Sequence, residues 1–318
     1  MQPPSSLRSL PPEGALSPLG RPGGAEILMR TPFQTPFHLQ LPRTPAIALV
    51  CDSPHSGTDY PEDFRAAVPM HLLRRGEDTH VDRLWAAVPE VGGTLLAAHF
   101  PRTYIDVNRT LDDLDPALMD GPWPTPLQPG PKTRLGYGLV WRNVNATTPI
   151  YDRQLSVQEV QQRIERCYQP YHAALAGAID DALLRFGRVW HLNLHSMPDD
   201  AYQRLGIRSP HPLADFVLGD RDGSTCSGEF VALVEAELRA RGYTVARNDP
   251  YKGVGLIAKI GQPALGRHSL QIELRRPVYM NEATREPTAN FGVVQADLAQ
   301  VLSAIARYIG AQTAAPSA

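Results

Sequence analysis

Two hydrophobic periods alternate along the chain and predict an α/β fold. Residues 46–51 form an unbroken apolar run, which is typical of a strand buried on both faces of a sheet. In residues 81–88 the apolar positions instead follow the helical spacing i, i+3, i+4, i+7. The expected strands are 46–51, 94–100, 103–107, 188–194, 215–219 and 268–275, and the expected helices are 81–88, 156–186 with an interruption at Pro170, 228–241 and 294–309. This alternation predicts a three-layer α/β/α architecture with a mostly parallel mixed sheet.

Histidine and glutamate side chains stand where the predicted strands end. His55 follows the first strand in a run of turn-forming residues, and His195 lies at the carboxyl end of the strand 188–194. Glu273 lies on the polar face of the alternating strand 268–275. Open α/β sheets build their ligand sites at the carboxyl ends of strands. One such histidine is more often structural, but the joint placement favours a functional site.

A carboxylate at the start of the predicted helix 81–88 would complete a metal site. Asp78 and Asp82 lie near its inward face, four residues apart. Two imidazoles and one carboxylate make a three-ligand zinc shell that leaves the fourth position open to water. The structural alternative is that Asp78 or Thr79 caps the helix and Asp82 complements its dipole.

Other charged residues suit the hydrolysis of an amide. Glu273 would be costly on a strand face unless it were paired or catalytic, and it is a candidate general base. Arg102 and Arg109 are candidates to bind an oxyanion and a substrate carboxylate. Each residue has a structural alternative: Arg102 in a surface ion pair, Asn108 as a turn former, and Glu273 as the partner of Arg275 or Arg276.

The composition excludes several classes of protein function. The chain has 318 residues and 42% hydrophobic content, which is enough for one large core. Its formal charge of -2, without a Lys/Arg block, gives no case for nucleic acid or anionic membrane. Cys51, Cys167 and Cys226 form no CxxC pair, so neither a disulfide framework nor a thiolate zinc site is indicated. No apolar run approaches the roughly 20 residues that span a bilayer. We expect a soluble cytoplasmic protein, and the sequence does not fix its oligomeric state.

The proline-rich residues 1–45 differ in composition from the rest of the chain and are predicted to be mostly disordered, although residues 33–41 are candidates to dock as an extended segment. Residues 46–312 are expected to form a single catalytic domain, and residues 313–318 to fray. Within that domain, residues 110–149 form a long Pro- and Gly-rich loop with a short strand expected at 138–141. Loops of this length usually cover or line a binding site.

Seven blocks of sequence carry a resemblance to a known family. They are SPHSG at 53–57, DTHVDRLW at 78–85, RTYIDVNR at 102–109, LHSMP at 194–198, LGDRDGSTC at 218–226, YKG at 251–253 and QIEL at 271–274. In this order they resemble the N-formylglutamate amidohydrolase family over about residues 46–282. That family is similar to the zinc carboxypeptidase and aspartoacylase group, so the resemblance implies a zinc carboxypeptidase-like (phosphorylase/hydrolase-like) fold.

The resemblance also implies one zinc ion, held by His55, His195 and an acidic residue. The larger group carries its acidic ligand three residues after the first histidine, where this chain has Thr58, so the carboxylate must come from elsewhere. Asp78 is preferred because it opens the helix after the first zinc strand, and Asp82 is the alternative. Cobalt and manganese also suit these ligands.

The family roles carry over to the matching residues as expectations. Glu273 is the base, Arg102 polarises the scissile carbonyl, and Asn108 with Arg109 holds the α-carboxylate. Lys252 and Arg142 are weaker candidates for a second carboxylate, with surface solvation as the alternative. Two departures, Val254 in place of the second glycine of KGG and Thr110 in place of proline after Asn-Arg, can alter the pocket.

These expectations lead to a functional hypothesis with a small-molecule substrate. The protein is expected to hydrolyse N-formyl-L-glutamate, or a close N-acyl amino acid, and to release formate and glutamate. The alternatives are a related zinc carboxypeptidase, a cell-wall amidase, or a non-catalytic protein that binds a small acid.

Overall fold

A mixed seven-stranded sheet forms the centre of the computed structural model, which describes residues 35–145 and 147–314. The strands are β1 (Phe37–Gln40), β2 (Leu49–Ser53), β3 (Thr94–Ala98), β4 (Val189–Met197), β5 (Phe216–Gly219), β6 (Val245–Arg247) and β7 (Arg267–Arg275). They lie in the order β1-β3-β2-β4-β7-β5-β6. Strands β3, β2, β4 and β7 are parallel neighbours, whereas β1 and β5 pair antiparallel with β3 and β7. The predicted mostly parallel mixed sheet is confirmed.

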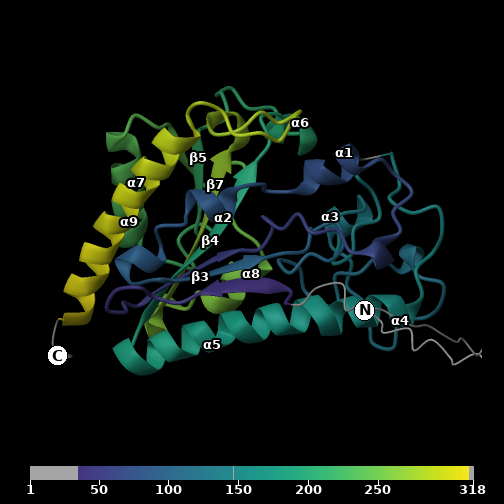
Figure 1. The fold of residues 1–318 in the computed structure, drawn as a ribbon, viewed down its shortest axis with the longest axis horizontal. Helices are drawn as coiled ribbons and strands as arrows, with labels where there is room; N and C mark the ends of the chain where they lie inside the picture. The colour runs from purple at the N-terminus through teal and green to yellow at the C-terminus, as the bar shows by residue number, and fades with distance from the viewer. Residues whose placement is uncertain (1–34, 146, 315–318) are drawn as a thin grey trace, which may run out of the picture. The chain divides into compact units, whose positions relative to one another are not determined.

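Helices cover both faces of this sheet (Figure 1). The α-helices of the described chain are α1 (Met70–Leu73), α2 (Val81–Leu84), α3 (Pro131–Arg134), α4 (Val157–Arg163), α5 (Gln169–Phe186), α6 (Ala201–Arg204), α7 (Gly228–Ala240), α8 (Gly255–Ile260) and α9 (Phe291–Ala314). Helix α5 packs against β2, β3 and β4, while α9 packs against α2 and α7 on the other side. The three-layer α/β/α prediction is therefore confirmed. None of the described helices has the length and apolar content needed to cross a bilayer.

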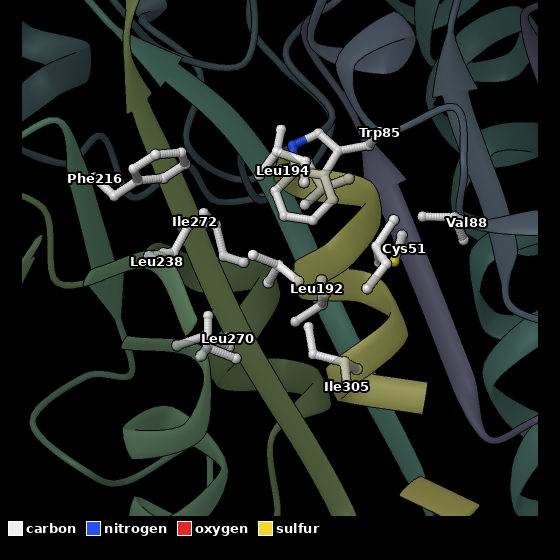
Figure 2. Packing of buried hydrophobic residues seen from close by; sticks show 14 of the residues in the cluster. Cys51, Trp85, Val88, Leu192, Leu194, Phe216, Leu238, Leu270, Ile272 and Ile305 are labelled. Carbon is white, nitrogen blue, oxygen red and sulfur yellow. The ribbon is translucent and has the colours of Figure 1, made fainter. Parts of the chain in front are cut away.

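The alternation along β4 sorts its side chains between a hydrophobic core and a polar face. Trp190, Leu192 and Leu194 are buried in one cluster with residues of β7, α7 and α9. Figure 2 shows Leu192 and Leu194 within this cluster. His191, Asn193 and His195 are buried too, but they hydrogen-bond to polar groups of neighbouring segments. Both sets follow from the period of two in the sequence.

Substitution of Leu192 by alanine tests the contribution of this core. Leu192 is completely buried at the centre of the cluster in Figure 2, so Leu192→Ala is expected to lower the free energy of unfolding by about 2–5 kcal/mol. Leu184→Ala is the matched control, because the Leu184 side chain is 87% exposed. Urea denaturation of both variants measures the difference, and equal stability of the two would contradict it.

The predicted strand 103–107 is wrong, because these residues form turns. The main-chain N–H of Asn108 donates to Oδ1 of Asp106 at 3.0 Å, and that of Arg109 donates to the Asp106 carbonyl at 3.1 Å. Side-chain to main-chain bonds of this kind favour turns over a strand ladder. The expected strand at 138–141 is likewise limited to an isolated bridge between Tyr137 and Trp141.

Element boundaries also differ from the predictions at other places. Helix α2 ends at Leu84, although the predicted stripe over 81–88 is buried as expected. Between α4 and α5 lies a π-helical turn, Ile164–Tyr168, and Pro170 stands in the first turn of α5. The wider π-turn accommodates a residue that has no N–H.

Both ends of the predicted domain extend further than expected. Strand β1 precedes residue 46 and pairs with β3, so the predicted docking segment 33–41 contributes an edge strand. Helix α9 continues to Ala314, past the predicted end at 312. Residues 1–34 and 315–318 of the predicted flexible ends lie outside the described residues.

Candidate active site

The candidate site lies at the carboxyl ends of β2, β4 and β7. His55 follows β2 directly, His195 belongs to β4, and Glu273 is its register partner on β7. Asp78 reaches the same point because its main-chain N–H donates to the His55 carbonyl at 2.9 Å. The loop after β2 also needs Gly57, where a Cβ atom would lie 2.3 Å from the Phe100 carbonyl oxygen. The parallel sheet thus brings four distant segments to one edge.

His55, Asp78 and His195 form a compact group of ligand atoms that could hold a metal ion. The two Nδ1 atoms are 3.1 Å apart, and Oδ2 of Asp78 is 3.1 Å from Nδ1 of His195 and 3.4 Å from Nδ1 of His55. Ligands about 2.0–2.1 Å from a tetrahedral zinc ion would be separated by about 3.3–3.4 Å. Asp82, the alternative carboxylate, is not in this group.

Hydrogen bonds on the far side of each ligand orient it toward the others. Nε2 of His55 lies 2.7 Å from Oδ1 of Asp106, and Nε2 of His195 lies 2.7 Å from Oδ1 of Asn193. The Asp106 carboxylate is an acceptor, so Nε2 of His55 carries the proton and its Nδ1 has a free lone pair. Nε2 of His195 also lies 2.9 Å from Nδ2 of Asn108. The second oxygen of Asp78 accepts from Nη2 of Arg276 at 3.0 Å.

The electrostatics of the group favour a positive charge at this point. Burial opposes ionisation of Asp78, but hydrogen bonds with His195 and His55 hold the pKa of this carboxyl well below its usual value. Burial also opposes a charged His195, yet its hydrogen bond with Asp78 and the charge of Glu273 raise the pKa of the imidazole. Two buried imidazoles and an ionised carboxylate are the donor set of a divalent metal, so these residues fit one.

Asp106 links the ligand group to the arginines of the site. Its Oδ2 accepts from Nη2 of Arg102 at 2.7 Å and lies 3.7 Å from Nε of Arg109. Burial works to raise the pKa of Asp106, but Arg102 and His55 hold it well below its usual value. The aspartate is completely buried and therefore depends on these partners.

Asp106→Asn is expected to weaken metal binding about 10- to 100-fold, as other outer-shell changes do. The asparagine amide can accept from His55 only if its NH2 group faces Arg102, so one contact is lost in either orientation. Competition with a chromophoric chelator measures zinc affinity. Asp222→Asn, which alters a surface ion pair with Lys252, is the control, and equal zinc affinity of the two variants would exclude this role.

A cavity of about 190 Å³ opens beside the ligand group. Liquid water occupies about 30 Å³ per molecule, so the cavity has room for a small organic acid. His55, Asp78, His195 and Glu273 line it, together with Arg102, Asn108, Arg109, Lys132, Trp141 and Tyr251. Burial raises the pKa of Glu273, and the nearby charge of Asp78 adds to this. A carboxylate with a raised pKa in a cleft is suited to proton transfer.

Several expected residues lie elsewhere. Lys252, a candidate for substrate binding, does not line the cavity; its ammonium group pairs with Asp222 at 2.9 Å and is largely exposed. Arg142 pairs with Asp115 at 2.7 Å, also outside the cavity lining. Lys252 thus lies at the surface, whereas Arg142 is partly buried. Neither Asp78 nor Thr79 caps α2, whose N-cap position is His80.

Three residues of the site were missed from the sequence. Asp106 lies inside the block RTYIDVNR, and its place between two arginines was the available signal. Arg276 was considered only as a partner of Glu273, whereas it binds Asp78. Lys132 lies in the loop 110–149, where no period indicates which side chains face inward.

Comparisons with known proteins identify relatives of this chain. Residues 47–280 match the model of the family N-formylglutamate amidohydrolase. The chain is 28% identical over 271 residues to an N-formylglutamate deformylase of Pseudomonas aeruginosa. The matched region covers 82% of this chain and 90% of the relative. A deformylase of Pseudomonas putida is 28% identical over 247 residues, or 74% of this chain and 83% of the relative.

A solved structure extends the comparison to the fold. The crystal structure of N-formylglutamate amidohydrolase from Ralstonia eutropha JMP134 superimposes with a TM-score of 0.87 at 66% sequence identity, and the match covers 87% of this chain and 99% of that one. The family match spans most of the described chain and contains His55, Asp78, His195 and Glu273. The chain therefore belongs to the N-formylglutamate amidohydrolase family.

Proposed function

We propose that this protein is a zinc-dependent amidohydrolase that cleaves N-formyl-L-glutamate, or a close N-acyl amino acid, into the carboxylic acid and the free amino acid. The observation that carries the proposal is the buried group of His55, Asp78 and His195 beside Glu273, in a cavity lined by several cations. The names of the relatives from Pseudomonas and Ralstonia support formylglutamate as the substrate.

The proposed reaction needs a Lewis acid and a base on one face of the substrate amide. A zinc ion held by His55, Asp78 and His195 would polarise the carbonyl and lower the pKa of a water molecule. Glu273 accepts a proton from the attacking water and delivers it to the amide nitrogen as the C–N bond breaks. Its raised pKa lets it take up that proton more readily than an exposed glutamate would.

The arginines divide between the carbonyl and the carboxylate in this proposal. Arg102 is held by two hydrogen bonds to Asp106 and stacks on Trp141, with 5.0 Å from its guanidinium carbon to the ring centre. A cation fixed in this way suits the oxyanion. Arg109 has a buried Nε without a hydrogen-bond partner among the described residues. It is therefore assigned to the α-carboxylate.

For Asn108 we propose a contact with the substrate other than the expected one with the α-carboxylate. Its Nδ2 lies 2.9 Å from Nε2 of His195 and 3.2 Å from Oδ1 of Asn193, and Asn193 in turn donates to Asp52. Oδ1 of Asn108 has no partner among the described residues. An acceptor cannot bind a carboxylate, so we assign it to the N–H of the scissile amide.

A substrate panel tests the function. Purified protein loaded with zinc is expected to release formate from N-formyl-L-glutamate faster than it cleaves N-acetyl-L-glutamate, dipeptides or cell-wall peptides. Formate and free amino acid are measured separately, so that deformylation and peptide cleavage give different signals. Absence of formate release would reject the proposal, and faster cleavage of a dipeptide or a cell-wall peptide would favour a carboxypeptidase or an amidase.

A further inference from the structure

The proposed substrate carries two carboxylates, and most cations of the cavity already have partners. Arg102 is bound to Asp106, and Arg276 is bound to Asp78. Arg204, at the rim, pairs with Asp200. If Arg109 binds one carboxylate of the substrate, the second needs another cation.

Among the cations that line the cavity, Lys132 is the one that is partly buried and has no ion pair within the described chain. Within residues 35–145 and 147–314, no carboxylate lies at ion-pair distance from its ammonium group. The group lies over the ring of Tyr251, 5.8 Å from the ring centre, and both side chains line the cavity. Arg75 also lacks an ion pair in the described chain, but it is exposed, and solvent weakens any contact it makes.

The loop that carries Lys132 is tied to the arginine expected to hold the α-carboxylate. Oδ1 of Asp113 accepts from the main-chain N–H of Gly130 at 2.8 Å and from the hydroxyl of Thr133. Oδ2 of the same aspartate lies 3.9 Å from Nη1 of Arg109. Asp113 therefore fixes helix α3, and Lys132 with it, beside Arg109.

The positive charges around Lys132 favour the binding of an anion. Burial, together with the nearby charges of Arg109 and Arg102, lowers the pKa of Lys132 to about 8. These three cations are near enough to repel one another, and a carboxylate placed among them would relieve that repulsion and replace the water lost on burial. A neutral side chain would leave Lys132 partly desolvated without a partner.

We propose that Lys132 binds the side-chain carboxylate of the substrate and so selects acidic N-acyl amino acids over neutral ones. This inference rests on the proposed hydrolysis of an N-acyl amino acid. It adds the residue that binds the side chain of that substrate. Lys132 replaces Lys252 and Arg142, which lie outside the cavity lining.

The test compares two substrates that differ only in that carboxylate. Zinc-loaded Lys132→Met is expected to lose about 10- to 100-fold in kcat/KM on N-formyl-L-glutamate, the effect of one charge-assisted hydrogen bond, and less than about threefold on N-formyl-L-glutamine. Lys132→Arg should recover most of the selectivity because it keeps the charge. Lys259→Met, at an exposed lysine outside the cavity lining, is the matched control and should behave like the unchanged protein.

Equal losses on both substrates would overturn the inference and would indicate that Lys132 acts through Glu273 or through the loop fold. Unchanged kinetics on both would overturn it as well. Calorimetric binding of L-glutamate and L-glutamine separates this inference from the proposed function. If the unchanged protein hydrolyses neither formyl compound, the proposed function fails. A glutamate preference that Lys132→Met removes would then still support the inference, and equal binding of the two amino acids would reject it.

Discussion

Glu273→Gln is expected to lower kcat by about 10²- to 10⁴-fold while the protein keeps its zinc. Glutamine has the same shape but cannot accept the proton of the attacking water. Glu273 is not part of the ligand group, so metal content should be unaffected. Single-turnover kinetics and elemental analysis of the same preparation measure both quantities. Normal turnover by this variant would refute Glu273 as the base.

The pH dependence of activity is a second test of Glu273 as the base. Burial raises the pKa of Glu273 above the ordinary value of a glutamate, and the base works only when it is ionised. Activity should therefore fall as the pH decreases through this raised pKa, earlier than for an exposed glutamate. Glu229→Gln, at an exposed glutamate, should keep the whole profile, whereas Glu273→Gln should lose the acidic limb of its residual activity.

Loss of the proposed metal ligand Asp78 is the second large effect that we expect. Asp78→Asn should weaken zinc binding by more than the 10- to 100-fold of an outer-shell change and should abolish activity at limiting zinc. The asparagine keeps the shape of the side chain but removes the charge that faces both imidazoles and Arg276. Zinc titration against a competing chelator measures the affinity.

Asp82→Asn is the matched control for this change. Asp82 was the alternative ligand, but the structure leaves it outside the group of ligand atoms, so its substitution should leave zinc affinity unchanged. Treatment of the unchanged protein with a chelator should remove activity, and added zinc should restore it. Full activity after verified removal of all metal would contradict metal dependence. Similar zinc affinity of the two variants would contradict the assignment of Asp78.

The sequence predicted which faces of the strands are polar because side-chain direction in a strand is a local property. The period of two along β4 and β7 put His195 and Glu273 on one face and Leu192 and Ile272 on the other. The failure at residues 103–107 has a similar local origin. The alternation there resembles a strand, but the side chain of Asp106 binds its own main chain and stabilises turns instead.

Residues in loops were harder to place from the sequence. Asp78 and Asp82 are equivalent by helical spacing. They differ in the tertiary structure, where Asp78 bonds to His55 through its main chain and to His195 through its side chain. Lys252 and Lys132 both follow Pro- or Gly-containing segments, and nothing local distinguishes the surface ion pair of one from the cavity position of the other.

The sequence by itself thus determined the α/β class, the buried faces and the strand ends that carry His55, His195 and Glu273. The tertiary structure decided that Asp78 lies beside the two histidines, that Asp106 contacts His55 and that Lys132 lines the cavity. The physical reason is the distance along the chain over which each effect acts. Hydrophobic periods and turn residues act over a few neighbours, whereas a ligand group forms only when strand order and loop conformation bring distant side chains together.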